Sequence, residues 1–428
     1  MELKKYKLGE ILDVKRGASL AGEYYATQGE YIRLTCGNFD YNNNCFKDNT
    51  SKDNLFYIGP IKPEFIMQKG DIITPLTEQA IGLLGSTALI PESGKYIQSQ
   101  DVAKIICKED KLYPKFAFYL ISSKLIRTQL SAAAQQTKIR HTSPDKIKDC
   151  VAWIPRLEEQ KTIGDLLSKI DSKIALNRRI NTRLEQIAKR LYNYWFVQFD
   201  FPNADGKPYK SSGGKMVWNE QLKREIPEGW EVKSVSELTT SARGVSYTAK
   251  DEKSASDENV VLILRGNNIS ENHIVYDGNT VYVDSSFVAE DQKIKKYDVV
   301  ITMSSGSKEH VGKSAMFFYD SEHSYGAFCN KLTPKKDCQF FIENYLHSDL
   351  FIKFIRQSCS GTGINNLTNA HFAKSLFAFP SDSILQSFNN KVRAIYDERG
   401  NLEQETAALT ALRDRLLPLL MNGQVEVA

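Results

Sequence analysis

The chain has 428 residues, of which 41% are hydrophobic and 25% charged, and its formal net charge is +4. This length is too great for one ordinary hydrophobic core and predicts two or more domains. No apolar run reaches the roughly 20 residues that span a membrane, no signal-like segment opens the chain, and the seven cysteines include no Cys-x-x-Cys pair. We therefore expect a cytoplasmic protein whose cysteines are reduced core residues.

The charge is unevenly distributed along the chain. Residues 1–155 carry +4, whereas residues 227–380 carry −3. A modest basic excess permits nucleic-acid binding without requiring it, and the acidic second region argues against a uniformly basic DNA cradle. Charge alone therefore does not decide the function.

Residues 1–155 mix helical and strand patterns and predict one globular α/β domain. Glycines and polar clusters separate its expected elements. These are a short helix ending at Gly17, a strand before a turn at Gly37-Asn38, a strand, a polar loop and a second strand within 69–90, one helix over 113–130, and a short strand ending at Pro155.

A heptad pattern fills residues 156–202. Apolar positions alternate at spacings of four and three, and only Asn177 and Asn181 interrupt them. About 36 residues at 1.5 Å each make a rod of roughly 54 Å. A lone helix of this kind would leave its apolar seam in water, so the pattern predicts a partner helix.

The partner lies in the same chain, because the sequence repeats itself after about 225 residues. Residues 203–226, rich in Gly, Ser and Lys, predict a linker. Residues 227–380 then repeat the first domain, and residues 381–428 repeat the rod. The paired landmarks are Gly17 with Gly244, Gly37-Asn38 with Gly266-Asn267, Asp71 with Asp298, and Pro155 with Pro380.

The two rods supply a predicted seam of apolar side chains. Arg399 and Arg413 fall on seam positions of the second rod, and Gly400 lies in its middle, which predicts a looser or kinked helix. The seam residues are Ile163, Leu167, Ile170, Ile174, Leu184, Leu191, Phe388, Val392, Ile395, Leu402, Leu409 and Leu416.

The sequence contains no convincing catalytic or metal-binding motif. Ser304–Ser314 resembles a P-loop, but Ser307 occupies a required glycine position and a strand pattern follows where a helix is needed. Cys36 and Cys45, like Cys329 and Cys338, are too far apart for ordinary zinc-ligand pairs. No nucleophile elbow, His-Glu-x-x-His, Rossmann fingerprint or Asn-Pro-Pro-aromatic motif is present.

Polar loops are the more informative feature, because they differ between the two domains while the scaffold repeats. Their side chains carry the donors and acceptors that recognise base edges, although ordinary hydrophilic loops have the same composition. The candidate DNA-binding residues are Lys15, Arg16, Arg33, Asn38, Thr77, Gln79, Gln136, Thr137, Lys138, Arg140, His141, Arg243, Tyr247, Arg265, Asn267, Asn268, Ser305, Ser307, Lys308, Ser360, Thr362, Asn365 and Asn366.

Two further sets of side chains lie on the first rod. Its terminal aromatics predict a hydrophobic junction with a globular domain, with base stacking as the alternative. Its basic residues fit either a solvated helix face or a surface near phosphates or a partner. The aromatics are Tyr192, Tyr194, Trp195, Phe196, Phe199 and Phe201, and the basic residues are Arg178, Arg179, Arg183, Lys189 and Arg190.

The whole chain resembles the specificity subunits of type I restriction-modification systems. The resemblance is strongest in LEQIAKRLYNYWFVQFDFP, in the following KPYKSSGGKMVWNEQLKREIPEGWEV, in TGINNLTNAHFAKSLFAFP and in the ending LRDRLLPLLMNGQVEV. It implies an α+β fold, with two target recognition domains (1–155 and 227–380) joined by two helices (156–202 and 381–428) that pack as an antiparallel coiled coil with an internal pseudo-twofold repeat.

The resemblance also implies a function without catalysis in this chain. Each domain would recognise one half of a split double-stranded DNA sequence, and the rod would fix the spacer. Two methylation subunits would bring S-adenosylmethionine, and restriction subunits, where present, would bring ATP and Mg-dependent chemistry. The alternatives are a stand-alone nuclease or NTPase with an unrecognised site and a structural coiled-coil adaptor.

Overall fold

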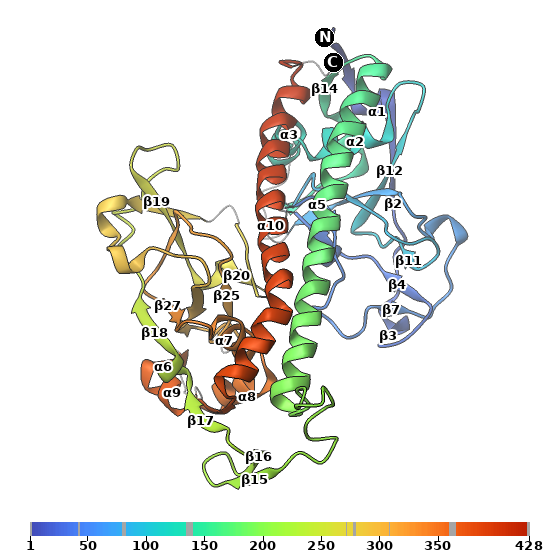
Figure 1. Ribbon diagram of the computed structural model, residues 1–428. Helices are drawn as coiled ribbons and strands as arrows, with labels where there is room; N and C mark the ends of the chain where they lie inside the picture. The colour runs from blue at the N-terminus through green and yellow to red at the C-terminus, as the bar shows by residue number, and fades with distance from the viewer. Residues whose placement is uncertain are drawn as a thin grey trace. The chain divides into compact units, whose positions relative to one another are not determined.

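A computed structural model describes residues 2–41, 43–78, 83–133, 140–270, 272–276, 280–307, 309–358 and 365–425 (Figure 1). The chain forms two compact units, Met1–Leu176 with Thr406–Ala428, and Asn177–Glu405. The division falls inside two long helices, α5 (Leu157–Tyr192) and α10 (Asp382–Met421), so each unit contains one globular domain and part of both helices. The helices of the described residues include none that is both long and apolar enough to cross a membrane.

The first domain is built on a four-stranded antiparallel sheet with the order β10-β8-β12-β2. Its first strand corrects one prediction, since the helix expected to end at Gly17 is only α1 (Leu8–Ile11) and is followed by β2 (Leu12–Arg16). Buried and exposed side chains alternate from Leu12 to Lys15, which is the period of a strand. The other strands are β8 (Ile72–Pro75), β10 (Ala88–Leu89) and β12 (Val102–Cys107).

Smaller sheets and helices complete the first domain. The single helix predicted over 113–130 is two helices, because Ser123 takes an extended ψ of 152° between them. These are α2 (Pro114–Ser122) and α3 (Lys124–Ala133), with α4 (Pro144–Asp149) further along the chain. The remaining strands are β1 (Lys4–Lys7) with β14 (Val151–Ile154), β11 (Tyr96–Ile97), β4 (Tyr31–Arg33), β7 (Phe56–Tyr57) and β3 (Tyr25–Ala26) in one sheet, β5 (Phe39–Asp40) with β6 (Cys45–Phe46), and β9 (Thr77–Glu78) with β13 (Arg140–His141).

The second domain repeats this architecture and confirms the predicted duplication. Its main sheet has the equivalent order β25-β23-β27-β18, from β25 (Ser314–Met316), β23 (Val299–Thr302), β27 (Cys329–Pro334) and β18 (Thr239–Arg243). The other elements are β17 (Glu231–Ser234) with β29 (Leu376–Phe379), β22 (Val281–Asp284), β19 (Val260–Leu264) and β26 (Ser324–Tyr325) in one sheet, β20 (Ile269–Ser270) with β21 (His273–Ile274), β24 (Ser304–Ser305) with β28 (Asn365–Asn366), and helices α6 (Val235–Leu238), α7 (Gln339–Leu346), α8 (Asp349–Ser358) and α9 (Asn369–Lys374).

One landmark of the repeat is shifted by a residue from the predicted register. The 3₁₀ turn Cys36–Asn38 corresponds to Gly266–Asn268, so Asn38 is equivalent to Asn268 rather than to Asn267. The amide of Asn38 accepts from Thr35 N at 2.9 Å and donates to Lys47 O. Asn268 makes the same two bonds with the backbone of Arg265 and Val275. The asparagine that holds the turn therefore defines the register, not the glycine.

Residues 203–226 contain regular structure where the sequence predicted a plain linker. Strands β15 (Met216–Asn219) and β16 (Arg224–Pro227) form an antiparallel hairpin. The ring of Phe201 stacks on Tyr209, with centroids 4.6 Å apart, and on Trp230. These aromatic contacts hold the segment on the second domain.

The end of α5 forms the predicted aromatic junction. A π-helical turn (Asn193–Val197) follows Tyr192 and turns Trp195 and Phe196 into the core of the second domain. Phe196 packs edge-to-face against Phe341 and Phe388, with centroids 5.0 and 4.8 Å away. Tyr194 is the exception, since it is 38% exposed.

Within each unit, the segments of the two long helices lie side by side (Figure 1). In the first unit, the start of α5 and the end of α10 contribute to one apolar cluster, which makes the pair antiparallel. In the second unit, Asn177 bonds Glu405 and Asn181 bonds Glu403, again in antiparallel order. Seven seam residues are buried (Ile163, Leu167, Ile170, Ile174, Phe388, Val392 and Leu402), and five are half-buried (Leu184, Leu191, Ile395, Leu409 and Leu416).

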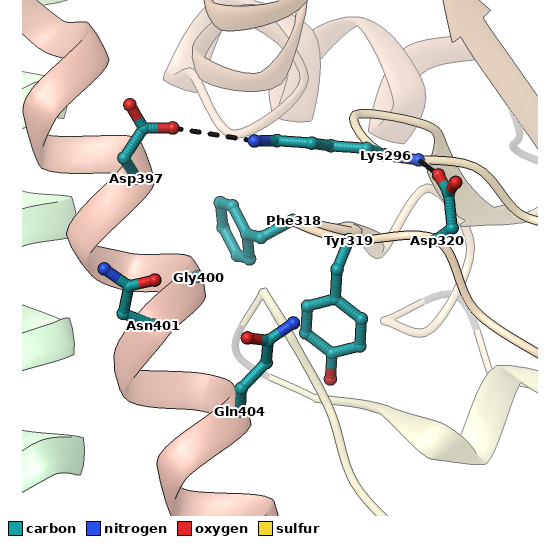
Figure 2. Close-up of a pocket in the computed structure, with 8 residues that line it drawn as sticks. All are labelled: Lys296, Phe318, Tyr319, Asp320, Asp397, Gly400, Asn401 and Gln404. Atoms are coloured by element: carbon teal, nitrogen blue, oxygen red, sulfur yellow. Dashed lines mark hydrogen bonds and ion pairs between the residues drawn. The ribbon is translucent and has the colours of Figure 1, made fainter.

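The helix α10 continues without interruption through Gly400. A Cβ at Gly400 would lie 2.9 Å from Cβ of Phe318, so the glycine admits the close approach of the second domain (Figure 2). Arg399 is 1% exposed and Arg413 is 9% exposed, and both make ion pairs. The seam arginines are therefore paired buried residues rather than defects of the helix.

Candidate nucleic-acid interface

The predicted polar loops of the first domain meet at one edge of its main sheet. Strands β2 and β8 both run antiparallel to β12 and both end where β12 begins, since Arg16 pairs with Ala103 and Pro75 pairs with Val102. Strand β9 continues from β8 and pairs with β13, which places Thr77 opposite His141. Loops that are more than 60 residues apart in the sequence therefore lie together at this strand edge.

Several candidate side chains of the first domain are accessible at this edge. Lys15, Arg16 and His141 are exposed. The guanidinium of Arg16 donates to the carbonyl of Gln100 at 3.1 Å, which orients it along the edge. Thr77 is half-buried, with its hydroxyl 3.1 Å from the Cys36 sulfur. The edge thus presents positive charge together with neutral donors and acceptors.

The second domain forms the equivalent edge. Strands β18 and β23 end where β27 begins, since Arg243 pairs with Asn330 and Thr302 pairs with Cys329. Strand β24 pairs with β28, and the Ser304 hydroxyl donates to the Asn366 amide oxygen at 2.6 Å. The two loops that the sequence singled out in this domain are again brought together.

The candidate DNA-binding side chains of the second domain differ in their accessibility. Arg243, Asn267, Ser307 and Asn366 are exposed, whereas Tyr247, Arg265 and Ser305 are half-buried. Burial raises the pKa of Tyr247, so its phenol is a neutral donor. This edge therefore carries mainly neutral hydrogen-bonding groups.

Three candidates have their polar groups engaged in the fold. Asn38 is 2% exposed and Asn268 is fully buried, and both amides hold the 3₁₀ turns described above. Arg33 is 7% exposed, stacks 3.9 Å above the ring of Tyr25 and donates to the carbonyl of Asn54. These side chains shape the loops instead of presenting groups to a ligand.

Other candidates lie partly or wholly outside the described residues. Arg140 lies on β13 and Asn365 on β28, which places their backbones in the two ladders. Outside the described residues are Gln79, Gln136, Thr137, Lys138, Lys308, Ser360 and Thr362.

The rejected motifs have structural roles. Ser314 begins strand β25, so no helix follows the P-loop-like segment. Cys329 and Cys338 are buried, and burial raises the pKa of Cys329 to about 12. Within the described ranges no group of His, Cys, Asp and Glu could hold a metal ion.

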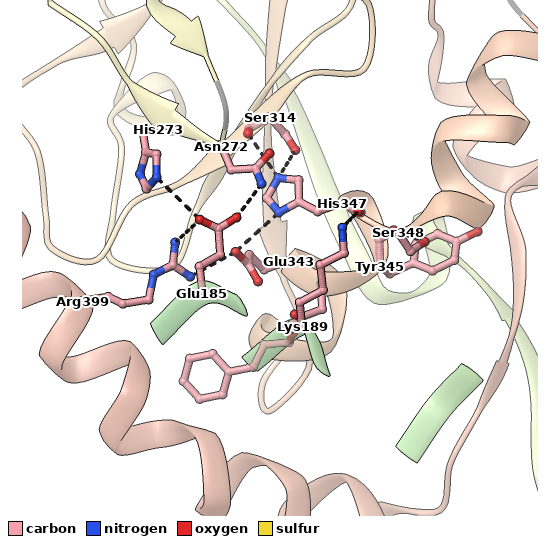
Figure 3. A network of polar contacts seen from close by, with 12 residues as sticks. Glu185, Lys189, Asn272, His273, Ser314, Glu343, Tyr345, His347, Ser348 and Arg399 are labelled. Carbon is pink, nitrogen blue, oxygen red and sulfur yellow. Dashed lines mark hydrogen bonds and ion pairs between the residues drawn. The ribbon is translucent and has the colours of Figure 1, made fainter. Parts of the chain in front are cut away.

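A buried charge network fixes the second domain on the helices of its own unit (Figure 3). Arg399 of α10 contacts the carboxylate of Glu343 on α7 at 3.4 Å and lies 3.9 Å from Glu185 on α5. Burial would raise the pKa of Glu343, but the hydrogen bond from His347 and the charge of Arg399 lower it to about 2. Bonds to Glu185 and Glu403 raise the pKa of His273 on β21 to about 9. Sequence reasoning missed this network, because its members are far apart in the chain.

Comparisons with known proteins agree with this architecture. The family model for "Type I restriction modification DNA specificity domain" matches residues 1–186 and 227–394, which are the two domain-and-helix repeats. The chain is 33% identical over 208 residues to the type I restriction enzyme StySPI specificity subunit of Salmonella potsdam, a match covering 47% of this chain and 45% of that protein. It therefore spans less than half of that relative's length.

Two further matches cover more of the chain. The type I restriction enzyme HindI specificity subunit of Haemophilus influenzae is 25% identical over 388 residues, which cover 77% of this chain and 81% of that protein. The S subunit of a type I restriction-modification system from M. genitalium superposes with a TM-score of 0.56 at 15% identity, covering 98% of this chain and 96% of that one. The latter likeness shows a shared fold.

Proposed function

Because the chain belongs to the type I restriction-modification DNA specificity family, we propose that it is the DNA-reading subunit of a methyltransferase complex. Each domain recognises one half of a split duplex sequence through the loops at its sheet edge. The observation that carries the proposal is the duplication itself, since equivalent strand ends present different polar side chains, Thr77 and His141 in one domain, Ser304 and Asn366 in the other. Such groups discriminate bases in the major groove.

The paired helices fit a role as spacer in this proposal. Helix α5 has 36 residues, which corresponds to about 54 Å, longer than one DNA turn of about 34 Å. Chemistry resides in the partners: two methylation subunits with S-adenosylmethionine, and restriction subunits with ATP and Mg where these are present. This chain supplies specificity and assembly.

The decisive experiment uses the chain co-purified with its methylation subunit. Mapping the methylated adenines on a random-sequence plasmid library is expected to give one split motif. Replacing residues 1–150 with those of another specificity subunit should change one half of the motif and leave the other half intact. Methylation without sequence preference would overturn the proposal.

Two biochemical assays separate this function from its alternatives. The isolated chain, incubated with DNA, Mg and ATP, is expected to neither cleave DNA nor hydrolyse ATP, unlike a stand-alone nuclease or NTPase. The assembled complex is expected to retain a sequence-dependent gel shift at high salt, whereas non-specific phosphate binding falls steeply with salt. A structural adaptor would give no sequence-dependent shift.

A further inference from the structure

Phe328 is the most exposed large hydrophobic side chain of the described residues, at 69%. It lies in the turn between β26 and β27, at the strand edge of the second domain. Single exposed apolar residues are common on protein surfaces, so exposure by itself indicates nothing. The position of this side chain is the informative feature.

The backbone of Phe328 is firmly held. Its carbonyl accepts from the amides of Met303 at 2.8 Å and Ser304 at 3.2 Å. The turn is closed by the amide of Cys329, which donates to the carbonyl of Gly326 at 2.8 Å. Gly244 packs so closely on this turn that a Cβ there would lie 2.2 Å from the Gly326 oxygen. The ring therefore projects from a rigid base and loses little backbone freedom on binding.

The same bonds place the ring beside the polar ladder. Ser304, which donates its amide to Phe328, is also the residue whose hydroxyl bonds Asn366. An apolar surface thus adjoins the donors and acceptors of β24 and β28. In a major groove, hydrogen-bonding groups recognise base edges, and an apolar group beside them matches the thymine methyl.

The first domain shows that the fold does not require an aromatic residue here. The equivalent residue is Asp101, whose carbonyl accepts from the amide of Leu76 at 2.8 Å, as Phe328 accepts from Met303. The backbone role is the same, and only the side chain differs. The position is thus structurally free to vary, as a specificity position must be.

We propose that Phe328 is a specificity-determining residue of the second domain, whose ring packs against a thymine methyl group in the half-site that this domain reads. The inference rests on the proposed function. It assigns to the second half-site an apolar contact that the first domain, with Asp101, does not make at the equivalent position.

The test compares Phe328→Ala with the unchanged chain in the complex with its methylation subunit. Binding is measured on the mapped target and on targets in which each thymine of the second half-site is replaced by uracil, which lacks the methyl group. One replacement is expected to weaken binding of the unchanged complex about fourfold, the value of one buried methyl-sized group. The Phe328→Ala complex should bind the thymine-containing target more weakly than the unchanged complex does. Its affinity should no longer fall when that thymine is replaced by uracil.

Two controls keep the test specific. Phe328→Leu retains an apolar side chain and is expected to keep the uracil effect. Leu350→Ala removes a 46% exposed side chain at the N-terminal end of α8. This change should alter neither the recognised motif nor the affinity for DNA. Loss of the uracil effect in Leu350→Ala would overturn the assignment.

The failures of the two proposals are distinguishable. A complex that methylates without any sequence preference would refute the proposed function. A complex with a clear split motif, whose binding ignores every uracil replacement or whose Phe328→Ala variant responds as the unchanged chain does, would refute only the role of Phe328.

Discussion

Each of the two domain-to-helix junctions has a hydrogen bond at equivalent positions. The tyrosine lies on the domain helix in the first unit and on the long helix in the second. In the first unit, the phenol of Tyr119 on α2 donates to Asp171 on α5 at 2.6 Å. In the second unit, Asn344 on α7 donates to the phenol of Tyr396 on α10 at 2.7 Å. Each residue of the second pair lies 225 positions after its counterpart. The duplication has kept the place of the contact while each copy acquired its own donor and acceptor.

The junctions also differ in burial. The pair Arg413–Asp171 has side chains 11% and 30% exposed, whereas those of Arg399–Glu343 are 1% and 3% exposed. Water can replace a lost partner in the first pair but not in the second. The second junction should therefore be the more sensitive of the two to the loss of one partner.

The largest effect is expected for Arg399→Met. This change leaves the buried carboxylate of Glu343 without its guanidinium partner, which typically costs about 3–5 kcal/mol in the free energy of unfolding. Urea unfolding followed by hydrogen exchange in the second domain measures the loss. Adding Glu343→Gln should restore part of the stability, and Arg393→Met, at an exposed position of the same helix, should have little effect. Equal stability of Arg399→Met and the unchanged chain would contradict the network.

A smaller loss, matched between the two domains, is expected for Gly17→Ala and Gly244→Ala. A Cβ at either position would lie 2.2 Å from a backbone oxygen, of Ser99 or Gly326 respectively. The neighbouring backbone must shift, at a cost of about 1–3 kcal/mol in each domain. Thermal unfolding is the measurement, and Gly22→Ala, whose nearest neighbour lies 4.0 Å away, is the control. A strong effect in only one domain would break the structural equivalence.

The second unit alone should lose stability at alkaline pH. Hydrogen bonds to Glu185 and Glu403 raise the pKa of His273 in the folded state from its ordinary value of 6.5 to about 9. Its contribution is therefore complete below pH 6.5 and is lost as the pH rises to about 9, by roughly 2 kcal/mol after allowance for a side chain 31% exposed. The free energy of unfolding, measured between pH 6.5 and 9, should depend less on pH in His273→Gln than in the unchanged chain. The same pH dependence should remain unchanged in His141→Gln, which alters an exposed histidine of the first domain.

The smallest effect is expected for Tyr119→Phe. Asp171 keeps its contact with Arg413 at 3.0 Å, so removal of one phenol hydroxyl should cost about 1 kcal/mol. Tyr396→Phe should cost more, because that hydroxyl also donates to the buried Glu343 at 2.5 Å. Chemical denaturation of both variants compares them directly, and a larger loss in Tyr119→Phe would reverse the ranking of the two junctions.

The duplication and the helix seam were predictable because both leave local, periodic signals. A heptad spacing is visible in the chain itself, and landmarks such as Gly17 and Gly244 recur because the fold needs a close backbone approach there. The meeting of the polar loops was only partly foreseeable. The sequence identified the loops, but the pairing of β9 with β13 depends on strand register.

The buried network and Phe328 were beyond the reach of pattern analysis. A heptad pattern treats Arg399 as a defect, since the partner that neutralises it, Glu343, lies 56 positions earlier. Phe328 resembles any core aromatic until the turn that exposes it is known. The one-residue error in the predicted register, which paired Asn38 with Asn267 instead of Asn268, also could not be avoided from the sequence. Only the hydrogen bonds reveal which amide holds the turn.

The hydrogen bonds from the amide of Asn177 to Glu405 and from the amide of Asn181 to Glu403 fix the register of the two helices. Sliding α10 by seven residues would place Leu412 instead of Glu405 against the buried Asn177, stranding a polar group. The length of the helix pair can therefore change only when α5 and α10 gain or lose matching turns. Under the proposed function, the length of the DNA spacer would therefore change in whole helical steps and not by single residues.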